Sequence, residues 1–303
     1  MFQLTLFQVA KLFTFLLIGY VLTKIKAIPE KATAVLSKAV INCFMPCLMF
    51  TTFCSEFTLQ TFRVEWRMML ASLIICIAEI LVCTLIGRHL SRDHYAQNIA
   101  VYSLAVPNNG YVGVPIILSL FGAAAVMRMQ IFLIPLLIYA YTEGARLLLD
   151  KDKISFRGIL NAPFLATLLG MVFGMLQIPV VPLAREVLDS CAACMSPCAM
   201  LLAGCAIAEF RIRDILSDPL LYIVVALRMI AIPAVIILVC RLIGLSDDIM
   251  ILVVAVFAMP TGLNTVVYPS SIGRDCRLGA GMACVSNALA LLTVPVVFHL
   301  FIK

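Results

Sequence analysis

Long apolar runs, separated by short polar connections, recur along almost the whole chain of 303 residues. A helix needs about 20 mainly apolar residues to cross the hydrocarbon core of a bilayer. The runs predict ten such spans, at residues 4–23, 33–53, 67–86, 96–120, 123–145, 158–177, 184–208, 220–243, 249–271 and 281–302. They are too long for transmembrane β-strands, which alternate over about 10 residues. The sequence therefore predicts an all-α membrane protein in contact with the lipid bilayer.

The composition argues against a soluble domain. Hydrophobic residues make up 63% of the chain and charged residues 13%, whereas soluble domains have about 45–50% and about 25%. The net charge of +6 is spread over short loops, which argues against nucleic acid as a partner because that would need a clustered basic face. The first apolar run carries Lys11 and lacks a small-residue cleavage site, so we interpret it as a span and not as a signal peptide.

The charges in the loops predict how the spans are oriented. Thirteen cationic residues lie in the loops after spans 1, 3, 5, 7 and 9: Lys24, Lys26, Lys31, Arg88, Arg92, Arg146, Lys151, Lys153, Arg157, Arg211, Arg213, Arg274 and Arg277. Six lie on the opposite side: Arg63, Arg67, Arg128, Arg185, Arg241 and Lys303. Positive loops stay on the cytoplasmic side. We therefore expect both termini to be extracytoplasmic, in an inner or plasma membrane.

Glycines and prolines recur at a spacing of half the chain. The matching pairs, 150 to 154 residues apart, are Gly19 and Gly170, Pro29 and Pro179, Pro46 and Pro197, Pro107 and Pro260, and Pro115 and Pro269. Each half has five spans, an odd number, so the two halves must enter the membrane in opposite directions. The pattern predicts a first repeat at 1–148, a cytoplasmic linker at 149–157 and a second, inverted repeat at 158–303. Inverted repeats are typical of secondary transporters.

Two predicted spans contain helix-breaking residues near their middle. Residues 106–115 read VPNNGYVGVP, and residues 259–269 read MPTGLNTVVYP. Proline removes a backbone donor and clashes with the preceding turn, and glycine relaxes the chain. The prolines expected to break these helices are Pro107, Pro115, Pro260 and Pro269. The freed backbone groups would cost several kcal/mol each in lipid, so these segments must face protein or a cavity.

Paired broken helices in inverted halves indicate a substrate site. The N-termini of half-helices present unpaired N–H groups and partial positive charge, which favours an anion. The expected substrate-binding residues in the two segments are Asn108, Asn109, Gly110, Thr261 and Asn264. Simple proline kinks, stabilised by neighbouring helices, are the alternative interpretation.

Residues 107–115 also resemble the Asn-x-Gly-aromatic-x-Gly-x-Pro signature of the auxin efflux carrier family, as residues 19–50 and 260–269 resemble other parts of it. The resemblance implies ten helices in two inverted five-helix repeats, with broken helices 4 and 9 crossing at the substrate site, as in the bile acid symporter-like fold. The chain lacks the long central loop of many plant carriers. It is therefore similar to the short prokaryotic-type members described as malonate or malate permeases, which makes a carboxylate a more natural substrate than auxin.

Two ionisable residues lie deep in predicted spans. Glu79 is in span 3, and Arg228 lies at a similar depth in span 8. Charges at this depth are costly unless they are paired, neutralised or facing water. We nominate Glu79 as a proton carrier and Arg228 as an anion ligand, with a structural pair between Arg228 and a carboxylate as the alternative. Na⁺ coupling, through Asn108 and the carbonyl groups of the broken helices, is the alternative to H⁺ coupling.

The remaining motifs favour no other class of function. Among twelve cysteines, Cys191, Cys194 and Cys198 only loosely resemble a metal site, so we interpret the cysteines as helix-packing residues and predict no metal and no cofactor. Neither a Gly-x-x-x-x-Gly-Lys loop nor a Gly-x-Ser-x-Gly or His-Glu-x-x-His motif is present, so we predict no enzyme activity. The sequence predicts a secondary transporter of a small organic anion, working by alternating access. A channel or facilitator for small anions is the alternative, and a homodimer is left open.

The orientation can be tested by labelling the midpoint loop. On a cysteine-free background, Lys153→Cys should react with a membrane-impermeant thiol reagent only after the cytoplasmic side is exposed, because the loop-charge rule places it inside. Arg185→Cys, predicted outside, is the matched control and should react in intact cells. Labelling of Lys153→Cys from outside intact cells would contradict the predicted orientation and the inverted repeat with it.

Overall fold

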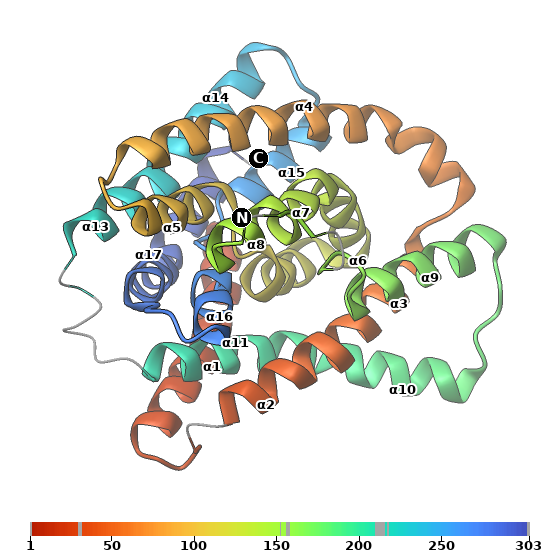
Figure 1. The fold of residues 1–303 in the computed structure, drawn as a ribbon. Helices are drawn as coiled ribbons and strands as arrows, with labels where there is room; N and C mark the ends of the chain where they lie inside the picture. The colour runs from red at the N-terminus through yellow and green to blue at the C-terminus, as the bar shows by residue number, and fades with distance from the viewer. Residues whose placement is uncertain are drawn as a thin grey trace.

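The computed structural model describes residues 2–29, 32–151, 153–155, 158–209, 216 and 218–301 (Figure 1). These residues are mostly helical, and their only strand-like contact is one isolated bridge. All-helical architecture was therefore predicted correctly. Six charged residues that bear on the predicted orientation lie outside the described residues: Lys31, Asp152, Arg157, Arg211, Arg213 and Lys303.

The first half of the chain forms α1 (Phe2–Lys24), α2 (Ala32–Ala39), η1 (Val40–Phe44), α3 (Met45–Glu56), α4 (Leu59–His89), α5 (His94–Ala105), η2 (Asn109–Gly113), α6 (Val114–Phe132), α7 (Ile134–Tyr141) and α8 (Glu143–Leu149). The second half forms α9 (Ala162–Leu176), α10 (Pro182–Ala193), α11 (Met195–Ala208), α13 (Pro219–Ala226), η4 (Leu227–Ala231), α14 (Ile232–Leu242), α15 (Asp247–Phe257), α16 (Asn264–Ser271) and α17 (Arg277–Phe301). The segments labelled η are short π-helical stretches.

Seven helices among the described residues are long and apolar enough to cross a membrane: Leu6–Lys24, Thr33–Glu56, Glu65–His89, Asn109–Phe132, Pro182–Ala208, Pro219–Leu242 and Arg277–Phe301. The ten predicted spans exceed this number for local reasons. The helix predicted at 158–177 is shorter, Ala162–Leu176, and the one predicted at 249–271 is divided into α15 and α16. The boundary predicted between spans 4 and 5 falls at Gly122, inside α6, where a φ of +79° interrupts the helical conformation.

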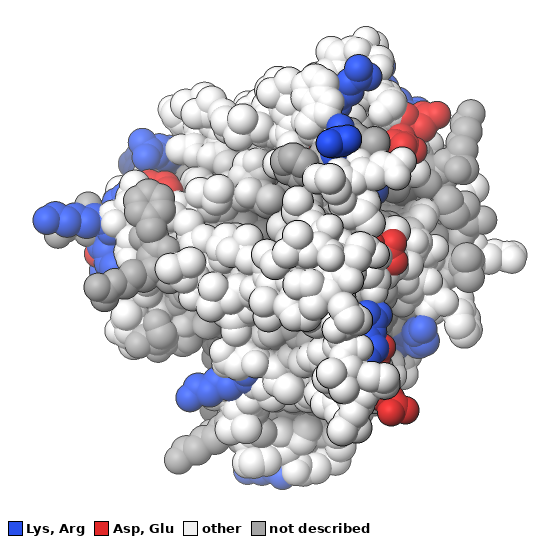
Figure 2. Space-filling model, turned by 90° about the vertical axis from the view of Figure 1, so that its right-hand side faces the viewer, with Lys and Arg blue, Asp and Glu red and all other residues white. Residues whose placement is uncertain are grey.

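The surface suits contact with lipid. One face of α4 exposes Leu70, Leu73, Ile74, Leu81 and Leu85. These residues have no protein to cover them, and a chain with so many exposed large apolar side chains is stable only where hydrocarbon replaces water. Most of the face shown in Figure 2 is likewise formed by uncharged side chains.

Prolines explain the three π-helical segments. Each segment ends two residues before a proline: η1 before Pro46, η2 before Pro115 and η4 before Pro233. The proline ring clashes with the carbonyl group of the residue four positions earlier, and a widened turn relieves that clash without ending the helix. The chain therefore remains helical through these prolines, with one distorted turn in each case.

Two pairs of helices pack backbone against backbone. α1 packs on α11, and α3 packs on α9. A Cβ atom added to Gly19 would lie 2.1 Å from the carbonyl oxygen of Leu201, and one added to Gly170 would lie 2.8 Å from that of Phe50. Glycine is required at both contacts, as is common between membrane helices. In Figure 1, α1–α3 and α9–α11 occupy the lower and right-hand part of the molecule.

Contacts between loops group them as the predicted orientation requires. Arg274 pairs with Asp150 at 2.5 Å and lies over the ring of Tyr95, which joins the loops after predicted spans 3, 5 and 9. Arg128 pairs with Glu65 at 2.8 Å and lies 3.7 Å from Asp248, which joins connections predicted to lie on the other side. Which group faces the cytoplasm stays a prediction.

Candidate functional site

The two interrupted segments meet and pair with each other. Pro107 and Thr261 form an antiparallel bridge. The backbone N–H of Asn108 donates to the carbonyl group of Pro260 at 2.6 Å, and that of Gly262 donates to the carbonyl group of Val106 at 3.3 Å. Backbone groups that the helices no longer satisfy are thus satisfied across the contact, which is what burial away from water demands. We call this contact the crossing.

Each interruption is short. α5 ends at Ala105, Val106 is extended with φ −111° and ψ 103°, and the helix resumes at Asn109. In the second half α15 ends at Phe257 and α16 begins at Asn264. Pro107 and Pro260 therefore lie in the interruptions, as predicted.

The other two prolines named with them lie within helical structure. Pro115 lies at the junction of η2 and α6, where the π-helical turn accommodates it, and Pro269 lies inside α16.

Arg228 binds the ends of both interrupted helices. Its side chain is fully buried, and its Nη1 donates to the carbonyl group of Leu104, at the end of α5, at 2.9 Å. Its Nε donates to the carbonyl group of Met259, just after α15, at 3.3 Å. Nη1 also lies 3.3 Å from a carboxylate oxygen of Glu79, on α4. The structure thus brings together the two charged residues that the sequence placed at similar depth.

This arrangement compensates the partial negative charge at the C-terminal ends of α5 and α15. The C-terminal end of a helix carries partial negative charge on its unpaired carbonyl groups, and a cation there is stabilising. Arg228 occupies that place for α5 and α15 together, while Glu79 balances its charge. The N-terminal ends of η2 and α16 receive no such compensation from charged residues of the ion pair.

Several buried polar atoms near the interruptions have no partner within the described residues. Both amide atoms of Asn109 and the amide nitrogen of Asn108 are unpartnered, although these residues are only 5% and 3% exposed. The hydroxyl group of Ser103 and the amide oxygen of Asn287 share this property. Unsatisfied buried polar groups are rare and costly, so each indicates a bound water, ion or ligand.

The other predicted site residues have partners in the protein. The hydroxyl group of Thr261 lies 2.7 Å from that of Ser286, on α17. The amide nitrogen of Asn264 donates to the hydroxyl group of Tyr102, on α5, at 2.7 Å. The oxygen of the Asn108 side chain caps η2 by accepting from the N–H of Tyr111 at 3.3 Å.

The remaining predicted residue, Gly110, lies near the neighbouring helix α3. A Cβ atom added to it would lie 3.6 Å from Cε of Met45. This is an ordinary contact distance, so side chains of α3 border the N-terminal end of η2.

Sequence reasoning missed four residues of this region: Tyr102 and Ser103 on α5, and Ser286 and Asn287 on α17. All four are fully buried. The signal was available, because each is a polar residue in the middle of an apolar run, but without a break or a charge it did not stand out.

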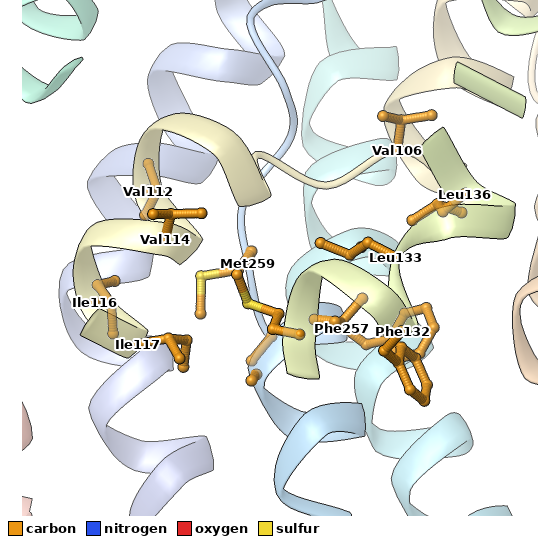
Figure 3. Close-up of a cluster of buried hydrophobic side chains, with 14 of the residues drawn as sticks. Val106, Val112, Val114, Ile116, Ile117, Phe132, Leu133, Leu136, Phe257 and Met259 are labelled. Atoms are coloured by element: carbon orange, nitrogen blue, oxygen red, sulfur yellow. The ribbon is translucent and has the colours of Figure 1, made fainter. Parts of the chain in front are cut away.

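The crossing is surrounded by apolar side chains from both halves. Figure 3 shows Met259, from the second interruption, beside Val114 and Ile117 of the first half and near Phe257, the last residue of α15. All four are essentially unexposed. Hydrogen bonds and charge pairs at the crossing are stronger in such low-dielectric surroundings than in water.

A cavity of about 370 Å³, open to the outside of the molecule, lies between α3, α6 and α10. Its polar lining consists of Thr51, Thr52, Ser55, Glu56, Arg185 and Asp189. The volume suits a small organic ligand. The predicted site residues do not line it, although Leu118 of its wall lies on the first turns of α6, which begin at the crossing.

Removing either charge of the buried pair should destabilise the protein strongly. Arg228→Met or Glu79→Leu alone leaves an uncompensated buried charge, which costs about 3–5 kcal/mol. The double variant should cost less than the sum, yet still about 1–3 kcal/mol, because the carbonyl groups of Leu104 and Met259 lose their donor. Thermal unfolding of the purified protein in detergent measures these differences.

The exposed pair Arg185–Asp189, at 2.9 Å on α10, provides the matched control. The variants Arg185→Met and Asp189→Leu should each change stability by about 0–1 kcal/mol. Strictly additive effects at Glu79 and Arg228 would show that the two residues do not act as a pair.

Comparison with known proteins shows the family to which the chain belongs. The family model described as membrane transport protein matches residues 4–155 and 147–298, which together cover almost the whole chain. A search of curated proteins found no match. The chain belongs to this membrane transport family, the family of the auxin efflux carriers, as the residues around the first interruption indicated.

Proposed function

We propose that the protein is a secondary transporter of a small organic anion, such as a carboxylate, that binds at the crossing. The observation that carries the proposal is the unpartnered state of Asn108 and Asn109 at the N-terminal end of η2. Amide groups buried in a membrane protein without partners are costly. A substrate that accepts hydrogen bonds from them removes that cost, and membership of a transport family says what the binding is for.

The distribution of charge supports an anion. Arg228 and Glu79 compensate the C-terminal ends of α5 and α15, so the partial positive charge at the N-terminal ends of η2 and α16 remains available. Backbone N–H groups at such ends bind carboxylates and phosphates. A cationic substrate would instead need the carbonyl ends, which Arg228 already occupies.

We further propose that the two halves form inverted five-helix repeats that give access to the crossing from each side in turn. Two glycine contacts support the repeat. Gly19 contacts the backbone of Leu201, and Gly170 contacts that of Phe50. Adding 151 to Gly19 and Phe50 gives 170 and 201, so the two contacts exchange when the halves are exchanged.

The cavity between α3, α6 and α10 is the proposed approach to the crossing from the extracytoplasmic side. Its walls carry residues at the end of α3 and the start of α10, which the loop charges place outside. Alternating access fits the structure better than a permanent pore does, because Asn108 and Asn109 are buried.

Loss of the asparagine side chains should weaken transport. Asn109→Ala removes a proposed substrate contact worth about 1–3 kcal/mol, which is roughly 5- to 150-fold in apparent affinity. Asn264→Ala removes the hydrogen bond to Tyr102 at the start of α16 and should also weaken uptake, because that bond positions the second interrupted segment. Uptake of labelled mono- and dicarboxylates into proteoliposomes measures this. Asn42→Ala, at an exposed position on η1, is the control and should transport normally. Unchanged uptake by both site variants would remove these asparagines from the mechanism.

We propose Glu79 as the residue that couples transport to protons. Its pairing with Arg228 gives protonation a structural effect: a neutral Glu79 would leave Arg228, which binds both helix ends, without its counter-charge. Na⁺ bound by Asn108 and carbonyl groups of the interrupted helices is the alternative. The unpartnered atom of the Asn108 side chain is its nitrogen, which donates to an anion and does not coordinate a cation.

Proton coupling can be tested by fixing Glu79 in a neutral form. Proteoliposomes with an imposed pH gradient should accumulate substrate, and Glu79→Gln should abolish that accumulation while retaining substrate exchange. Retained exchange shows that the variant is folded. Accumulation by the parent protein that follows a Na⁺ gradient and ignores pH would contradict the role of Glu79.

A further inference from the structure

Two predicted repeats carry the same cysteine pattern. Residues 43–47 and residues 194–198 both read Cys-x-x-Pro-Cys, 151 residues apart. The first copy spans the junction of η1 and α3, and the second the start of α11. The proline lies three residues after one cysteine and directly before the other in both copies.

The structure gathers both thiols of the first copy and a third, Cys191, which lies three residues before the second copy. The sulfur atoms of Cys43, Cys47 and Cys191 all lie within 4.8 Å of one another. Cys43 and Cys47 are four residues apart on one continuous helix, and Cys191 comes from α10, which packs against α3. All three are free thiols, with Cys43 exposed and the other two half-buried.

The geometry is close to that of a three-sulfur coordination site. Metal–sulfur bonds of about 2.3 Å place three sulfur atoms around one ion about 4 Å apart. If each sulfur atom moved by a few tenths of an ångström, the three would reach that separation. Two ligands from one helix and a third from its neighbour fix the site without a loop, and rigid elements hold metal ligands more precisely than loops do.

We propose that Cys43, Cys47 and Cys191 bind a soft metal ion, of which Cu(I) fits best. Thiolates select soft ions, and Cu(I) accepts three sulfur ligands. Structural zinc takes four ligands in a tetrahedron, and no histidine or carboxylate joins the group among the described residues. This site differs from the crossing and does not depend on the transported substrate. It replaces, for these three residues, the interpretation of the cysteines as packing residues alone.

The three thiols lie close to the cavity along the chain. Cys47 and Cys191 directly precede Leu48 and Ala192, which line the cavity between α3, α6 and α10. An ion bound to both helices would link α3 to α10 at the wall of that cavity.

The test is a Cu(I) titration of the purified, reduced protein in detergent under anaerobic conditions, against a chromophoric Cu(I) chelator. The wild-type protein should take one Cu(I) per chain. Cys43→Ser, Cys47→Ser and Cys191→Ser should each lower the affinity at least about 100-fold, because loss of an outer-shell partner alone costs about 10- to 100-fold. Cys54→Ser, on the same helix outside the group, is the matched control and should bind as wild type.

X-ray absorption at the copper edge should then show only sulfur ligands at a count of three. Size-exclusion profiles establish that each serine variant is folded, and three separate variants ensure that at least one can be assessed. Equal Cu(I) affinity in wild type and in the three variants would overturn the proposal. The proposal would also be overturned if Cys54→Ser lowered the affinity for Cu(I) as much as the three site variants do.

Discussion

The arrangement of this protein depends on one buried cation. Arg228 is fully buried and satisfies carbonyl groups at the ends of α5 and α15, while Glu79 balances its charge. An interrupted helix inside a membrane exposes backbone groups that lipid cannot satisfy, at several kcal/mol each. Two interruptions side by side double that problem. One guanidinium group, with donors in a fixed fork, serves both carbonyl groups at once, which a lysine amine at the same place could not do with the same geometry.

The same residue decides what the crossing can bind. Because the negative helix ends are compensated within the protein, the opposite ends near Asn109 and Asn264 keep their partial positive charge. Neutral amides supply directed donors there without the cost of burying another cation. These features are the basis for proposing an anion as the substrate. Arg228, expected from the sequence to be either an anion ligand or a structural partner of a carboxylate, makes contacts of the second kind, while its Nη2 is buried without a partner among the described residues.

Sequence patterns predicted the helices and the two interruptions because proline, glycine and apolar length act locally. Pro107 and Pro260 lie in the interruptions for that reason. Pro115 and Pro269 lie within helical turns instead. Whether a proline interrupts a helix depends on the neighbouring helices, which the local sequence does not reveal. The sequence predicted that Glu79 and Arg228 lie at a similar depth, because depth depends only on position along each span. It could not predict that the two side chains face each other, because that depends on how the two helices are rotated relative to one another. Ser286 and Asn287 were not predicted as part of the site for the same reason, since a short polar side chain in an apolar run does not indicate which residues it faces.

The contacts also indicate where movement would occur if access alternates. α4, α5 and α15 are tied together through Glu79, Leu104 and Met259 by the side chain of Arg228, so they would move as one body. α1 and α11, and α3 and α9, are joined by glycine contacts too close to slide without separation. The cavity lies between α3, α6 and α10, so it borders the second of these groups. Two groups of helices can move past each other only where their side chains do not interlock. A boundary that contains a cavity has fewer contacts to break during such a movement.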